Sequence, residues 1–126
     1  MYKTLLLIGT GGFLGSTSRY LLARFIAHQW PSVFPYGTFV VNILGCLTIG
    51  LLMGFSFSND LSASYRLFLA AGFCEGFTTF STFSLELFEV YQKGQTGLAL
   101  IYALVSIVFG FLAVGVGFWL TKGIKG

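Results

Sequence analysis

Two long stretches of this chain contain no charged residue. No Asp, Glu, Lys or Arg lies between Arg24 and Asp60, and none lies between Lys93 and Lys122. Each stretch can hold a helix of about 20 apolar residues, the length that crosses the hydrocarbon core of a bilayer. Only 9% of the 126 residues are charged, whereas a soluble domain carries about 25%. Because so few charges cannot cover a water-facing surface, the sequence predicts an integral membrane protein in contact with membrane lipid.

Short segments rich in loop-forming residues divide the chain into four apolar parts. We expect one all-α transmembrane domain over residues 1–126, with four helices at about 3–26, 36–57, 65–91 and 97–122. No soluble domain or linker is left over, so any function must reside in the helices. The residues that mark the three loops are Pro31 and Pro35, then Ser58, Asn59, Asp60 and Ser62, then Lys93, Gly94 and Gln95.

The cationic residues hardly favour one orientation in the membrane. Four crossings place both termini on the same side as the second loop, and orientation normally follows an excess of Lys and Arg on the cytoplasmic side. One side would hold Lys3, Arg66, Lys122 and Lys125, and the other Arg19, Arg24 and Lys93. This balance fits a protein that inserts in both orientations, and equally one with a single, weakly specified orientation. The scattered cations form no basic stripe, so a nucleic-acid partner is not expected.

The segment from Gly72 to Ser84 is polar at a depth where the rest of the chain is apolar. It contains a carboxylate, glycines and a cluster of hydroxyl side chains that includes Ser81 and Thr82. Irregular backbone occurs at membrane depth only where protein buries it or where it lines a polar cavity. We therefore predict a break in the third helix near residues 76–79, with free backbone groups that create an ion site. The alternative is a continuous helix whose hydroxyls bond back to their own turn.

Two phenylalanines follow the predicted break. Phe80 and Phe83 are three residues apart and share a helix face. An aromatic ring has a negative face and a positive edge, so two ring edges turned towards a pore can hold a small anion. Taken alone, two phenylalanines at this spacing more often indicate core packing. Asn42 lies midway along the second helix, where its amide can donate to an anion or to a neighbouring helix.

Further polar residues extend this candidate pathway. Tyr102 and Ser106 are four residues apart on the fourth helix and add hydroxyls along one face. Arg19 is a candidate for a positive pore mouth, or it extends to the lipid headgroups. Glu86 is a candidate to face the hydroxyl row. The sequence contains no zinc-ligand spacing, nucleophile–base pair or phosphate loop, and His28 is its only histidine, so we do not expect an enzyme.

The residues from Gly76 to Phe83, Gly-Phe-Thr-Thr-Phe-Ser-Thr-Phe, resemble the signature of the Fluc (CrcB) fluoride channels. The resemblance continues in Gly37-Thr-Phe-Val-Val-Asn42 and in the glycines before Arg19, so it covers all four helices. It implies an antiparallel, dual-topology homodimer in a bacterial inner membrane, with passive export of fluoride from the cytoplasm that relieves fluoride toxicity. By the resemblance, Phe80, Phe83 and Asn42 would contact fluoride, and Thr38, Tyr102 and Ser106 would form a polar track.

The resemblance also implies a structural sodium ion between the two subunits. Its ligands would be backbone carbonyls of Thr78 and of the residue three positions earlier, which is Glu75 here. The family pattern has glycine at that position, so a carboxylate now stands beside the predicted ion. Either the Glu75 carbonyl still binds sodium, or the carboxylate replaces or strengthens the site.

A small multidrug-resistance-type transporter is the alternative from another class. Such a protein is also a dimer of four-helix subunits, and it exchanges protons for cations through a carboxylate in its first helix. Residues 3–26 contain no acidic residue and carry Arg19 instead. Glu75 is the only feature that favours this alternative.

Overall fold

The chain forms four helical rods, as the sequence predicts, and the third of them is broken. The computed structural model describes residues 1–57 and 63–125; of the predicted second loop, Ser58, Asn59, Asp60 and Ser62 lie outside the described residues. The first rod is α1 (Tyr2–Gln29), the second is α2 (Tyr36–Phe57) and the fourth is α6 (Thr96–Lys125). The third rod consists of α3 (Ala63–Arg66), the π-helix η1 (Leu67–Cys74), α4 (Glu75–Phe77) and α5 (Phe80–Gln92).

The predicted helix boundaries agree with the structure to within three residues. The bounds of α2 are those predicted, while α1 runs on to Gln29, where the Trp30 N–H donates to the Ile26 carbonyl at 2.9 Å. The third loop is confirmed at residues 93–95. Gly94 has a φ of 80° there, a conformation that is cheap only for glycine. This tight turn brings α6 back along the rod it follows.

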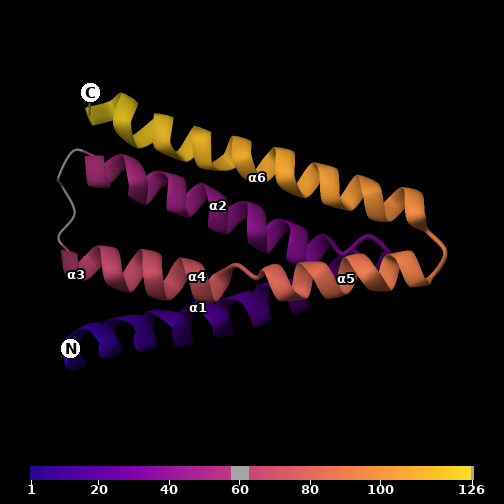
Figure 1. Ribbon diagram of the computed structural model, residues 1–126, viewed down its shortest axis with the longest axis horizontal. Coiled ribbons are helices and arrows are strands. Elements are labelled where there is room, and N and C mark those ends of the chain that lie inside the picture. Colours follow the sequence, from indigo (N-terminus) through magenta and orange to yellow (C-terminus); the bar gives the residue numbers. More distant parts are fainter. Residues whose placement is uncertain (58–62, 126) are drawn as a thin grey trace.

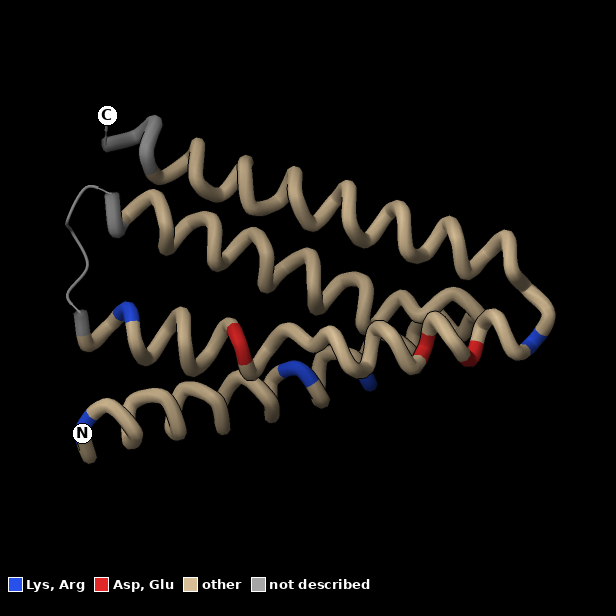
Figure 2. The backbone as a smooth tube through the Cα atoms, in the orientation of Figure 1, with Lys and Arg blue, Asp and Glu red and all other residues tan. Residues whose placement is uncertain are grey.

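Successive rods run in opposite directions (Figure 1). Both termini lie at one end of the molecule, together with the end of α2 and the start of α3 (Figure 1). In Figure 2, the parts of α2 and α6 that are not drawn in grey are free of charged residues. The spans Tyr36–Phe55 and Thr96–Thr121 of these two helices are long and apolar enough to cross a membrane.

The first rod contacts the third through glycines on both sides. A Cβ atom added at Gly11 or Gly15 would collide with the carbonyl oxygen of Phe68 or Phe73, and one added at Gly72 would lie 2.9 Å from the Gly11 Cα. Backbones approach this closely only where side chains are absent. The small-residue spacing in the first predicted helix therefore serves packing within one subunit. This close packing holds η1 and α4 against α1.

The second rod packs along the fourth in the same way. A Cβ atom at Gly50 would collide with the Val114 carbonyl, and one at Gly54 with the Thr121 hydroxyl. Val41 and Tyr102 are fully buried between the rods. Large apolar side chains remain exposed on the outside of α1 and α6, including Phe13, Leu21, Leu104 and Phe111. Such exposed surface is expected where lipid or another subunit covers it.

Candidate functional site

The third rod breaks at two extended residues. Thr78 has φ −89° and ψ 154°, and Thr79 has φ −150° and ψ 120°, between the end of α4 and the start of α5. The break predicted near residues 76–79 is confirmed, although Gly76 itself is helical, and a continuous helix is excluded. The eight-residue π-helix η1, which α4 separates from the break, was not predicted. Wide helical turns of this kind are frequent at functional sites.

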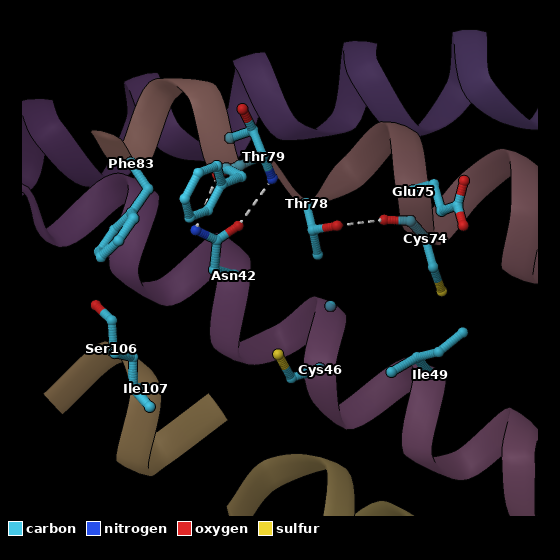
Figure 3. A pocket seen from close by; sticks show the side chains of 12 residues that line it. Asn42, Cys46, Ile49, Cys74, Glu75, Thr78, Thr79, Phe83, Ser106 and Ile107 are labelled. Carbon is cyan, nitrogen blue, oxygen red and sulfur yellow. Dashed lines mark hydrogen bonds between the residues drawn. The ribbon is translucent and has the colours of Figure 1, made fainter. Parts of the chain in front are cut away.

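Asn42 holds the break in place from the neighbouring rod. Its Nδ2 donates to the Thr79 carbonyl at 3.3 Å, and its Oδ1 accepts from the Thr79 N–H at 3.0 Å (Figure 3). The amide therefore satisfies both backbone groups that the break would otherwise leave without partners. This bond between rods is the alternative role that the sequence allows for Asn42. One N–H of the same amide is still available to an anion, because each side-chain amide has two.

The break also releases backbone carbonyls, because their usual donors bond elsewhere. In a continuous helix the N–H of Thr79 would donate to the Glu75 carbonyl, and that of Thr82 to the Thr78 carbonyl. Here the Thr79 N–H donates to Asn42, and the Thr82 N–H donates to the Thr79 hydroxyl at 3.2 Å. The carbonyls of Glu75 and Thr78 thus lose their helical partners within one turn of each other.

Arg19 occupies a third carbonyl near the break. The sequence allows this side chain either a pore mouth or the lipid headgroups, and in the structure its Nε donates to the Gly76 carbonyl at 3.2 Å. In a continuous helix the Phe80 N–H would bond that carbonyl. Arg19 is therefore positioned by α1 as a cap on α4. It lies against the broken rod.

A cavity of about 400 Å³ opens beside the break. We call it the first cavity; its lining comes from α2, the third rod and α6, and consists of Asn42, Gly45, Cys46, Ile49, Cys74, Glu75, Thr78, Thr79, Phe80, Phe83, Ser106 and Ile107. Figure 3 shows Phe83 and Ser106 at one end and Glu75 at the other. The Ser106 Oγ is buried and has no hydrogen-bond partner in the described part of the chain. A buried hydroxyl without a partner is rare, and this one stands at the cavity wall.

Aromatic rings connect this cavity with a second one. The Phe83 ring lies 6.1 Å from that of Phe80 and 4.9 Å from that of Tyr102, measured between ring centroids. The Tyr102 hydroxyl donates to Glu86 Oε1 at 3.4 Å, and the same carboxylate interacts with the Thr38 side chain. Thr38 and Glu86 line a second cavity of about 380 Å³ at the end of the molecule near residues 30–38. Phe83, Tyr102 and Glu86 thus form a continuous row between the two cavities.

The predicted site residues fall into three groups. Asn42, Glu75, Thr78, Phe80, Phe83 and Ser106 line the first cavity, and Thr38 and Glu86 line the second, with Tyr102 between them. Thr82 and Ser81 belong to the first turn of α5, where the Ser81 hydroxyl lies 3.3 Å from that of Thr79. Arg19 alone lies on the α1 side of the third rod, away from both linings. Sequence reasoning missed the capping role of Thr79, although a threonine three residues before the Thr82 N–H is a usual helix start.

Cys46 and Cys74 are also in the lining of the first cavity. Both are free thiols, and Cys74 is buried. Buried free thiols of this kind usually behave as small hydrophobic side chains.

These features together define a class of protein. An all-helical bundle with uncharged spans, and with a cavity beside a broken helix, is typical of membrane proteins that bind ions within the membrane. Residues 6–118 match the model of the family described as CrcB-like protein, Camphor Resistance (CrcB). The chain belongs to this family, which confirms the resemblance of its third-helix signature.

Relatives match the chain over nearly its whole length. Proteins of Azobacteroides pseudotrichonymphae and Phocaeicola vulgatus are 44% and 43% identical, covering 97% and 95% of this chain and 98% and 99% of their own. A protein of Bacteroides fragilis is 41% identical, covering 98% of this chain and 99% of its own. Each is named fluoride-specific ion channel FluC.

Proposed function

We propose that the chain forms a fluoride-selective ion channel, through which fluoride leaves the cytoplasm passively so that fluoride toxicity falls. It acts by conduction, without a catalytic step. The names of its relatives support fluoride as the ion. The observation that carries the proposal is the lining of the first cavity, where a hydroxyl without a partner, an amide N–H and phenylalanine rings surround one open space.

This lining suits a small anion that must also leave. The Ser106 hydroxyl and the free N–H of Asn42 can each donate one hydrogen bond, and the ring edges of Phe80 and Phe83 add weak positive potential. No Lys or Arg lines the cavity. A channel needs binding that is strong enough for entry and weak enough for release, and neutral donors meet both conditions better than a cation would.

The row of Phe83, Tyr102 and Glu86 marks the path that an anion would follow between the two cavities. From the first cavity, an anion would pass the Phe83 ring and the Tyr102 hydroxyl and reach the second cavity at Thr38. The Glu86 carboxylate at this point accepts the Tyr102 hydrogen bond. Movement of the Tyr102 hydroxyl from Glu86 to a passing anion would exchange one acceptor for another.

A second copy of the chain, oriented antiparallel in the membrane, completes the site. Phe80 lines the first cavity and yet is 80% exposed in a single chain, which supports a second subunit covering this side of the cavity. The near balance of Lys and Arg between the two sides suits a dual-topology homodimer. The lengths of the four rods and their apolar outer surfaces support four crossings per subunit in contact with lipid, and we propose the inner membrane of a bacterium as their location.

The sodium ion fits the residues that would hold it. The carbonyls of Glu75 and Thr78 are the two whose helical donors bond elsewhere, and oxygen atoms are the ligands that hard cations prefer. These carbonyls would hold sodium between the subunits, and the ion would add positive charge that stabilises the interface. The backbone carbonyl of residue 75 is available as a ligand whether the side chain is that of glycine or of glutamate.

Growth in fluoride tests the proposed function in cells. Bacteria that lack their own fluoride exporter and express this chain should grow at fluoride concentrations that stop cells carrying an empty vector. Growth is scored against an equal concentration of sodium chloride as the control. No difference between the two strains, with the protein present in the membrane, would contradict the proposal.

Labelling tests the antiparallel dimer. A cysteine placed at residue 125, in a chain whose Cys46 and Cys74 are replaced by serine, should react with a membrane-impermeant thiol reagent from both sides of the membrane in one population of cells. About half of the protein should react from each side. Labelling from one side alone would rule out dual topology and with it the antiparallel arrangement.

A further inference from the structure

Glu75 has a carboxylate that makes no hydrogen bond or ion pair within the described chain. It is exposed, it lines one end of the first cavity, and no hydrogen bond or ion pair joins its side chain to another described residue. Membrane interiors tolerate a carboxylate only when it has a partner. Figure 3 shows it beside Cys74, away from the phenylalanine end of the cavity. The carboxylate therefore has a different role from the anion-binding groups.

The helix geometry separates Glu75 from the nearest cation. Gly72 and Gly76 face α1, where Arg19 caps the Gly76 carbonyl. Glu75 directly precedes Gly76, and successive residues of an α-helix point about 100° apart, so the Glu75 side chain leaves the rod beside the face that contacts α1. The described residues hold no ion pair between Arg19 and Glu75. Glu75 thus lies on the flank of α4 that α1 leaves open.

Three oxygen-bearing groups of one turn are available on this short segment. They are the released carbonyls of Glu75 and Thr78 and the carboxylate of Glu75. In an antiparallel dimer, the proposed interface would bring two such sets together and supply six or more oxygens. Calcium takes about six to eight oxygen ligands and accepts irregular geometry, whereas magnesium demands a near-ideal octahedron and keeps its water.

We propose that Glu75 turns the cation site between the subunits into a calcium-type divalent site, in which the carboxylates of both copies join the carbonyls as ligands. The proposal rests on the proposed dimeric channel. Two carboxylates carry a charge of −2, which one sodium ion would leave half compensated and one calcium ion neutralises. Uncompensated charge is costly inside a membrane. Where the family pattern has glycine, the site has no side-chain charge. With Glu75 in its place, the site carries two negative charges and should prefer a divalent ion.

The melting temperature of the purified dimer in detergent tests this inference. The protein is freed of metal with a chelator and kept in N-methylglucamine buffer, and then calcium chloride, magnesium chloride or sodium chloride is added. Calcium should raise the melting temperature by roughly 5 °C at a hundredfold excess over its Kd, and equal concentrations of magnesium or sodium should raise it less. Glu75→Gln should lose the calcium response. Glu89→Gln, which removes one carboxylate on α5 away from the site, should keep it.

Three results would overturn the inference. They are a calcium effect that persists in Glu75→Gln, sodium acting as strongly as calcium, and stabilisation by acid in place of calcium, which would mean that Glu75 binds a proton. Fluoride efflux of the native protein is measured on the same preparation. Efflux without a calcium response refutes the divalent site alone, whereas absence of efflux refutes the proposed channel.

Discussion

Replacing Asn42 with leucine should abolish fluoride conduction and destabilise the protein. The Thr79 N–H and carbonyl would both lose their partners, at 3.0 and 3.3 Å, and leucine has nearly the same size but no polar atom. An unsatisfied buried backbone group costs about 1–3 kcal/mol, so the free energy of unfolding should fall by about 2–4 kcal/mol. Thermal unfolding in detergent measures the loss of stability, and fluoride efflux from liposomes measures the loss of conduction.

Thr48→Ala is the matched control on the same helix. The Thr48 hydroxyl donates only to the Leu44 carbonyl of its own turn, at 2.8 Å, and it does not line the first cavity. Stability and efflux should both stay near those of the native protein. If Asn42→Leu melted and conducted like this control, Asn42 would not hold the break, and the break would depend on other contacts.

Phe83→Ile should lower fluoride efflux by at least tenfold while the dimer still forms. Isoleucine keeps much of the apolar bulk but removes the ring whose edge carries positive potential. The ring lies between Phe80 and Tyr102, at the point where the two cavities approach each other. A loss of about 1.4 kcal/mol of anion stabilisation along the path corresponds to a tenfold lower rate. Phe80→Ile should have the same direction of effect.

Phe88→Ile provides the comparison for this prediction. Phe88 lies on the same helix α5, is 55% exposed and contacts Tyr91 outside the first cavity. Efflux should change little in this variant. Equal efflux from Phe83→Ile, Phe88→Ile and the native protein would leave Phe83 as a packing residue.

The fold could be predicted because its elements depend on local sequence. Pro35 and the apolar run after it determine where α2 begins, and Lys93, Gly94 and Gln95 determine where α5 gives way to α6. The break in the third rod was predictable because glycine and hydroxyl residues interrupt an apolar stretch. The π-helix Leu67–Cys74 was not predictable from its own residues, since their hydrophobic pattern also fits an α-helix.

The sequence indicated many of the residues that line the candidate site, but not the hydrogen bonds that they make. Asn42 and Arg19 reach the break from positions 37 and 57 residues earlier in the chain than their bonding partners. Such pairings depend on how rods cross, which the periodicity of one helix does not contain. For the same reason the carbonyls released at Glu75 and Thr78, and the buried Ser106 hydroxyl, became visible only in three dimensions.

Fluoride efflux from liposomes tests the central claim most directly. Liposomes that contain the purified protein are loaded with fluoride and chloride, and a potassium ionophore removes the voltage that would otherwise stop net anion movement. The account predicts rapid loss of fluoride, retention of chloride and no requirement for a proton gradient. Equal loss of both anions, or efflux only when a proton gradient is imposed, would contradict it.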